Sequence, residues 1–193
     1  MELQELSGNV LTYNNFHYKV NEIPEEFKLV FNAIDEETET LLINLIKSTG
    51  PGPSTNPSDK TRLKEILKCF SKEFYEFAGP NTSEGTPQKL KYQLNTQSSH
   101  VLVKGEGMPF IEHDAKHNPI VIVVNMGSDI LFTLKDKTTQ RLINIPLPRR
   151  SMFLLQDEKR KYQRGIAKRP FDDIGGNKIQ RETRYSLLFE SRK

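Results

Sequence analysis

The stretch that decides the fold is residues 119–134, with the sequence PIVIVVNMGSDILFTL. It contains two apolar runs rich in β-forming residues, and Gly127 lies in the turn between them. Such a pair predicts two strands joined by a turn. Four segments of the same kind lie on either side, at residues 100–103, 142–146, 151–155 and 184–189. Short strands at this spacing are typical of a β-sandwich or barrel.

Two helices are predicted before these strands. The first begins after Asp35, a good N-cap residue followed by acidic residues, and ends at Gly50 and Pro51. The second begins at Ser58 or Asp59 and ends at Gly79–Pro80, with apolar residues at helical spacing between: Leu63, Ile66, Leu67, Phe70, Phe74 and Phe77. The predicted fold class is therefore α+β, with N-terminal helices packed on one sheet.

The chain is divided into an arm and one domain. Residues 1–28 are polar and mixed, and we expect an N-terminal arm in which residues 16–20 form a short edge strand. Residues 29–193 form the domain, and residues 29–31 are a strand that leads into the first helix. A chain of 193 residues is long enough for one such core.

The composition excludes several classes of protein. With 35% hydrophobic and 27% charged residues the chain is predicted to be globular. The longest aliphatic run, residues 120–124, is far shorter than the roughly 20 residues of a membrane helix. The N-terminus lacks the pattern of a secretory signal, and the single Cys69 allows no intrachain disulfide. We therefore expect an intracellular protein, cytoplasmic or nuclear, with no membrane partner.

Positive charge is concentrated near the C-terminus. Residues 141–193 hold 14 Lys or Arg against 6 Asp or Glu, whereas residues 1–140 hold 14 against 19. The densest group is a candidate nucleic-acid surface, formed by Lys159, Arg160, Lys161, Arg164, Lys168 and Arg169. A solvated face of an ordinary domain is the alternative, because few aromatic residues lie among these charges.

The four histidines limit the possible metal chemistry. They are His17, His100, His113 and His117, so none follows residue 117. A local site formed by His113, Asp114 and His117 could bind zinc. The alternative is that these polar residues face solvent in a loop.

Several short segments occur in an order that resembles the AlkB family of Fe(II)- and 2-oxoglutarate-dependent dioxygenases. They are HVLV at 100–103, GEGMP at 105–109, NPIV at 118–121, NMGSDI at 125–130, LPRRS at 147–151, RGI at 164–166 and RYSLLF at 184–189. The resemblance implies a double-stranded β-helix, or jelly roll, over residues 29–193. This fold agrees with the strand pattern read from the residues alone.

The resemblance also implies an iron site, which this sequence does not preserve. The family binds iron with a His-x-Asp pair and a distal histidine that opens a His-Gly-Ile segment. Arg164 stands at the distal position, and a guanidinium has no lone pair to donate to a metal. At the first pair, either Glu112 and Asp114 or Ile111 and His113 occupy the two places. Glu112, His113 and Asp114 are thus degenerate candidates for metal ligands.

The co-substrate site is altered in the same way. Arg184 matches the arginine that binds the carboxylate of 2-oxoglutarate, and it is the one functional residue that can be carried over. The second arginine of that closing motif is replaced by Glu190, and the family's Asn-x-Tyr motif is reduced to Lys104.

We therefore expect a pseudoenzyme that needs no cofactor. It would act as a binding or scaffolding subunit with RNA-associated or protein partners. In this interpretation Arg164 fills the former iron site and pairs with Asp114 or Glu112. The first alternative is an active dioxygenase that uses Fe(II) and 2-oxoglutarate with atypical ligands, to demethylate nucleic acid or protein oxidatively. The second is a nucleic-acid-binding module that acts through its basic C-terminal face.

Overall fold

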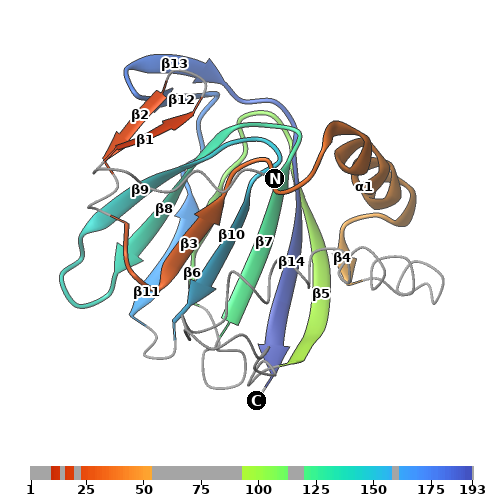
Figure 1. The fold of residues 1–193 in the computed structure, drawn as a ribbon, viewed down its shortest axis with the longest axis horizontal. Helices are drawn as coiled ribbons and strands as arrows, with labels where there is room; N and C mark the ends of the chain where they lie inside the picture. The colour runs from red at the N-terminus through yellow and green to blue at the C-terminus, as the bar shows by residue number, and fades with distance from the viewer. Residues whose placement is uncertain are drawn as a thin grey trace, which may run out of the picture.

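The computed structural model describes residues 10–13, 16–19, 23–53, 93–112, 120–157 and 161–192. Two antiparallel sheets form most of this part of the chain (Figure 1). The second predicted helix, with Cys69, lies outside the described residues, as do His113, Asp114, His117, Lys159 and Arg160.

The larger sheet has six strands. Its order is β3 (Phe27–Val30), β10 (Met152–Gln156), β7 (Ile120–Met126), β14 (Arg184–Arg192), β5 (Gln93–Leu102) and β4 (Gly52–Pro53). The smaller sheet has four strands, in the order β6 (Met108–Glu112), β11 (Tyr162–Ile166), β8 (Ile130–Asp136) and β9 (Leu142–Leu147). Two hairpins complete the described strands: β1 (Val10–Tyr13) with β2 (Phe16–Lys19), and β12 (Phe171–Ile174) with β13 (Asn177–Gln180).

The predicted strands are all present, with modest changes at their ends. The strand expected at residues 29–31 is β3, which begins at Phe27, and the strand expected at residues 16–20 is β2. The strand expected from His100 is the end of the much longer β5. Strand β6, which pairs with β11, was not predicted. The loop expected at residues 113–117 lies outside the described residues.

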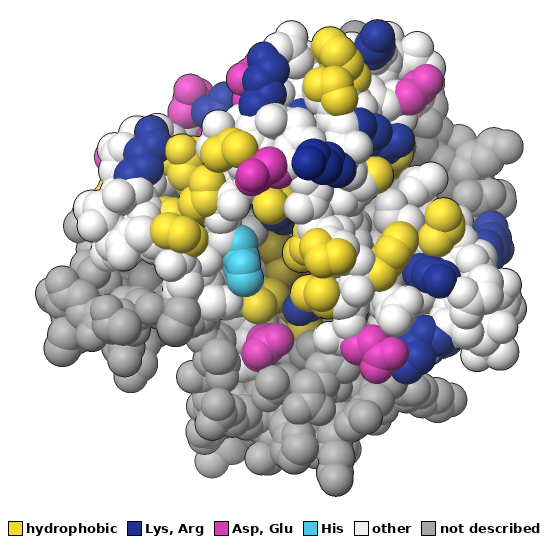
Figure 2. Space-filling model, turned by 180° about the vertical axis from the view of Figure 1, so that it is seen from behind, with side chains coloured by type: hydrophobic (Ala, Val, Ile, Leu, Met, Phe, Trp, Pro, Cys, Tyr) yellow, Lys and Arg dark blue, Asp and Glu magenta, His cyan; other side chains and the backbone are white. Residues whose placement is uncertain are grey.

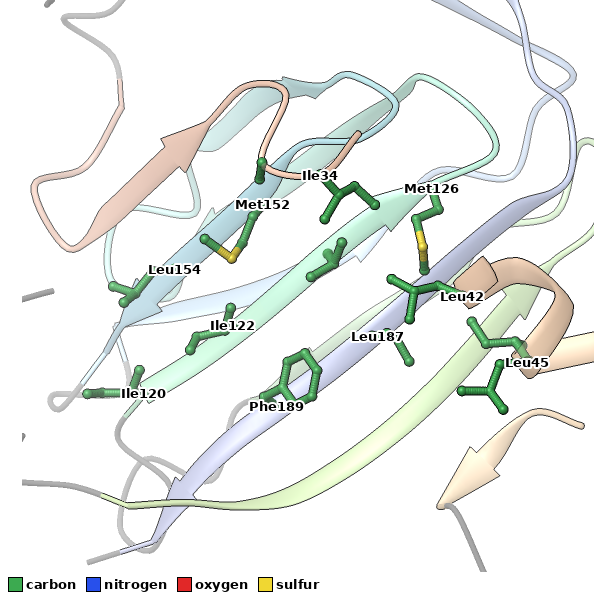
Figure 3. Close-up of a cluster of buried hydrophobic side chains, with 13 residues drawn as sticks. Ile34, Leu42, Leu45, Ile120, Ile122, Met126, Met152, Leu154, Leu187 and Phe189 are labelled. Atoms are coloured by element: carbon green, nitrogen blue, oxygen red, sulfur yellow. The ribbon is translucent and has the colours of Figure 1, made fainter. Parts of the chain in front are cut away.

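One helix, α1 (Glu36–Thr49), lies against one end of the outer face of the larger sheet (Figure 1). As predicted, Asp35 caps it by accepting a hydrogen bond from the Thr38 N–H at 2.7 Å, and the chain leaves it at Gly50. Its apolar side chains join a buried cluster formed by alternate residues of β10, β7 and β14, in which Leu42 lies near Met126 and Leu187 (Figure 3). We call this side of the sheet the outer face.

The buried carboxylate of Glu39 fixes α1 to the turns of the sheet. It accepts two hydrogen bonds from Nε of Arg149, at 2.7 and 2.8 Å, and one from the Gly127 N–H at 2.8 Å. Gly127 has φ +81°, a conformation that favours glycine. Arg149 therefore acts here as an anchor for the helix.

The second core lies between the two sheets, in what we call the interior. Phe27, Phe132 and Phe153 stack there, with ring centroids 4.9 to 6.2 Å apart. Alternate residues of every long strand join them because side chains of a strand point to opposite faces in turn. Of the helices that the structure describes, none has the length and apolar character to cross a membrane.

Candidate ligand-binding interior

A row of polar side chains interrupts the apolar interior on the larger sheet. Arg184, Ser186 and Glu190 share the inner face of β14, since they alternate with Tyr185, Leu187 and Phe189 of the outer core. Ser186 lies directly between His100 of β5 and Asn125 of β7 in the strand register. Three strands that are distant in sequence thus bring the polar side chains of His100, Asn125 and Ser186 together.

Arg184 is fully enclosed in this row. Its Nε donates to Asn125 Oδ1 at 2.7 Å and its Nη1 donates to Ser186 Oγ at 3.1 Å. Both of these partners are neutral. Burial and, less strongly, the positive charge of Arg181 lower the pKa of Arg184 to about 10, so the guanidinium stays protonated at neutral pH.

Arg164 faces this row from the smaller sheet. It lies on β11 opposite Leu134 of β8 and Ile111 of β6, and Leu134 belongs to the interior core. Only 8% of the Arg164 side chain is exposed, and its Nη1 has no hydrogen-bond partner among the residues that the structure describes. Burial lowers the pKa of Arg164, and the carboxylate of Glu190 opposes that shift.

The two positions at which the sequence resemblance implies a changed residue lie next to each other. Arg164 Nη2 is 4.0 Å from Glu190 Oε1. The sequence suggested that Arg164 pairs with Asp114 or Glu112. Asp114 lies outside the described residues, and the structure does not pair Arg164 with Glu112. Glu112 pairs instead with Lys137 at 2.9 Å. The reason is the register, since Glu112 lies opposite Gln163, whose side chain points to the other face of β11 from Arg164.

The interior is open to solvent beside β5 and β6. His100 and Ile111 both belong to inner faces, yet both are exposed. Partial burial, and then the charges of Arg184 and Arg164, lower the pKa of His100, so its imidazole is neutral at pH 7. Figure 2 shows a face of the molecule that is hollowed near its centre, with hydrophobic side chains in the hollow.

The described residues do not fit an Fe(II) centre. They contain no group of three His, Cys, Asp or Glu side chains that could hold a metal ion. The side chain at the distal position is a buried cation, which repels a metal dication and offers it no lone pair. The candidates His113 and Asp114 lie outside the described residues, and Glu112 stays a prediction as a ligand.

The predicted nucleic-acid residues do not form one surface within the described part of the chain. Arg164 is buried in the interior, whereas Lys168 is exposed. Lys161 and Lys168 lie beyond opposite ends of β11, and Arg169 is paired with Asp172 at 2.8 Å. Nucleic-acid binding by this set stays a prediction.

Comparison with solved structures identifies the architecture. One similar structure is an oxidoreductase of the 2OG-Fe(II) oxygenase family from Burkholderia pseudomallei, with a TM-score of 0.59 over 86% of this chain and 84% of that one. Another is OsALKBH1, with a TM-score of 0.62 over 87% of this chain and 99% of that one. The chain has the fold of the 2-oxoglutarate/Fe(II) oxygenases. Sequence identity to each is 10%, so the likeness extends to the fold alone.

Sequence comparison adds one relative without a described activity. The uncharacterized protein L905 of Acanthamoeba polyphaga mimivirus is 32% identical over 90 residues, which are 45% of this chain and 43% of that protein. The match therefore spans less than half of the length of L905. No protein-family model matches the chain.

Sequence reasoning found the two arginines but missed most of the residues around them. Asn125 and Ser186 read as ordinary strand residues, and the position of His100 beside Ser186 was not predicted. The alternation of side chains along residues 120–126 and 184–190 could have indicated this group, because it places Asn125, Arg184 and Ser186 on one face of the sheet.

Proposed function

We propose that this protein is a non-catalytic relative of the AlkB-like dioxygenases that acts as a binding or scaffolding subunit. The observation that carries the proposal is the buried guanidinium of Arg164 inside a roll of oxygenase fold. A side chain that stays protonated and cannot donate a lone pair replaces the nitrogen ligand that such an enzyme needs. We derive no step through iron because the described residues do not fit it.

Exposed apolar side chains support a protein partner. Phe110 of β6 and Leu142 of β9 are 44% and 53% exposed. Both lie on the outer face of the smaller sheet, since Phe110 packs over Gly165 and Leu142 pairs with Lys135. They lie on the two edge strands of that sheet, so each offers a separate apolar contact to a protein partner and the two form no continuous patch. RNA-associated partners remain part of the proposal through the basic C-terminal region.

The test is turnover of 2-oxoglutarate by protein purified and reconstituted with Fe(II) under anaerobic conditions and then exposed to oxygen. We expect no succinate above the level of a protein-free control, and less than one tenth of an equivalent of bound iron after desalting. The Arg164→His variant, measured in parallel, shows whether that one replacement limits metal retention. Stoichiometric iron in the wild-type protein, or succinate formed with or without a prime substrate, would favour the active dioxygenase with atypical ligands.

A further inference from the structure

We infer that the β12–β13 hairpin and the turn beside it bind an acidic segment of a partner protein that also carries an apolar side chain. The inference deepens the proposed function and rests on it, because it takes the protein to act by binding a protein partner. The surface consists of the exposed face of the hairpin, residues 167–170 before it, and the turn at residues 103–106. We call it the hairpin surface. Figure 1 shows the hairpin at one edge of the molecule, away from α1.

The hairpin has one buried and one exposed face. Asp172 and Ile174 are buried, whereas Phe171 and Asp173 alternate with them and are exposed. Lys178 lies opposite Asp173 in the register, and its Nζ is 4.5 Å from the centroid of the Phe171 ring. Phe171 is 39% exposed. The hairpin therefore presents an aromatic side chain next to a cation.

The turn at residues 103–106 lies against the start of the hairpin. A Cβ on Gly105 would be 3.8 Å from Cα of Pro170, so the turn contacts the residue before Phe171. Val103, the first residue of this turn, is 52% exposed. Two segments that are distant in sequence thus each contribute an exposed apolar side chain to one region, as contact sites for other proteins commonly do.

The side chain of Arg181 holds these segments together from inside. Its Nη1 donates to the carbonyl oxygens of Ala167 at 2.6 Å and Glu106 at 3.3 Å. Its Nε and Nη2 donate to the buried carboxylate of Asp172 at 2.6 and 2.7 Å. The hairpin surface is therefore ordered before a partner arrives, which lowers the entropic cost of binding.

The charge around Phe171 indicates an acidic partner. Residues 167–181 hold four Lys or Arg against two Asp, a surplus of two positive charges. Lys168 and Lys178 are exposed and form no ion pair with the residues that the structure describes. Arg169 shares the carboxylate of Asp172 with Arg181, so that carboxylate balances only one of the two. Carboxylates of a partner would supply the complementary charge.

The surroundings favour a protein over a nucleic acid. Glu106, Asp173 and Glu182 lie in or beside the hairpin surface, and they would repel a strand that carries a phosphate at every nucleotide. Lys178 also lies over the Phe171 ring, on which a base would have to stack. A protein segment can place one or two carboxylates beside the cations alone.

The experiment is an NMR titration of the full chain with the synthetic peptide acetyl-Glu-Leu-Glu-amide, read from the backbone ¹H–¹⁵N signals. We expect saturable shifts centred on residues 103–106 and 167–181. Two control peptides replace either both Glu by Lys or the Leu by Ala, and each should bind at least about fivefold more weakly. Pentauridylate, titrated at the same ionic strength, tests the nucleic-acid alternative and should bind more weakly than the acidic peptide.

Three variants test the assignment of the surface. Phe171→Ala should weaken binding of the acidic peptide by about tenfold and Lys178→Met by about threefold. Leu142→Ala, which removes an apolar side chain that is 53% exposed on the edge strand β9, is the matched control and should bind like the wild type. Lys178→Met decides the question even if Phe171→Ala does not fold.

Several outcomes would overturn the inference. They are the absence of saturable shifts, shifts centred on other residues, an unchanged affinity in Phe171→Ala or Lys178→Met, a loss of affinity in Leu142→Ala, equal binding of a control peptide, and tighter binding of pentauridylate.

The two proposals fail separately. Succinate formation with added iron would refute the proposed loss of catalysis and leave the peptide titration unaffected, because the titration contains neither iron nor 2-oxoglutarate. Failure of the peptide to bind would refute the hairpin surface and leave the turnover assay to be judged on its own result.

Discussion

Replacing Arg164 by methionine should make the protein more stable, although it removes an ion pair with the partly exposed Glu190. Methionine has a similar length and no polar hydrogen to satisfy. The free-energy gain comes from Nη1, since an unsatisfied buried donor costs about 1–3 kcal/mol. The loss comes from the pair with Glu190, whose side chain is 18% exposed and lies 4.0 Å away, at the limit of an ion pair. Because Glu190 keeps contact with solvent, we assign this pair up to about 1 kcal/mol, the value of an exposed pair, and not the several kcal/mol of a fully buried one.

The balance is a gain of about 1–2 kcal/mol in the free energy of unfolding. For a chain of this size that corresponds to a rise in Tm of about 2–8 °C. Urea unfolding and calorimetry in carboxylate-free buffer measure both quantities. Lys168→Met, which removes an exposed positive charge, is the control and should stay within about 0.5 kcal/mol of the wild type.

The opposite outcome has a clear meaning. If Arg164 serves as a plug that neutralises an emptied metal site, its removal leaves carboxylates unpaired and Arg164→Met is less stable than the wild type. A loss of more than about 1 kcal/mol would therefore refute our account of Arg164 as a buried cation with an unsatisfied donor.

Three further predictions concern the frame of the site. Glu39→Ala should lower the free energy of unfolding, measured in urea, by about 3 kcal/mol. The reason is that it removes the carboxylate that accepts hydrogen bonds from Arg149 and from the Gly127 N–H. An effect below about 1 kcal/mol would contradict this anchoring role. Gly127→Ala should destabilise the protein by more than about 1 kcal/mol in thermal unfolding. The reason is that φ is +81° and a Cβ would meet the Thr183 carbonyl oxygen at 2.5 Å. A Tm like that of the wild type would show that the turn can relax. Burial alone would raise the pKa of Asp172, but hydrogen bonds from Arg181 and other donors outweigh burial and lower that pKa. This carboxylate therefore stabilises the fold above its unfolded pKa near 4, and the stabilisation is lost as the pH falls further. The free energy of unfolding, measured over the acid range, should depend less steeply on pH in Asp172→Asn.

The strands that could be predicted are those whose burial is regular. Residues 120–126 are apolar on both faces because one face belongs to the outer core and the other to the interior. In residues 130–136 the interior face is apolar, with Ile130, Phe132 and Leu134. The alternation in residues 142–147 likewise reflects one buried and one exposed face. In such segments hydrophobic pattern and tertiary packing agree, which is why the order of strands could be read in advance.

The elements that could not be predicted are stabilised by pairing with distant strands, and their own sequences have little strand propensity. Residues 93–99 are mostly polar, yet they pair with β14 along its length. The β12–β13 hairpin was missed although Gly175–Gly176 forms its two-residue turn, because its strands read FDDI and NKIQ. Asp172 and Arg181 explain this hairpin, since each is buried and their ion pair measures 2.6 Å. Long-range pairing of this kind leaves little trace in local propensity.

The position of Arg164 argues against a side chain that only fills the interior. A filling residue needs no charge, and an apolar residue at that place would bury more surface and leave no donor unsatisfied. The chain instead holds a guanidinium there, with Nη1 unsatisfied and Nη2 4.0 Å from the Glu190 carboxylate. Arg184, on the larger sheet, is held separately by the neutral Asn125 and Ser186. Residues that lower stability in this way are expected where a protein binds something, because the ligand then supplies the missing partner.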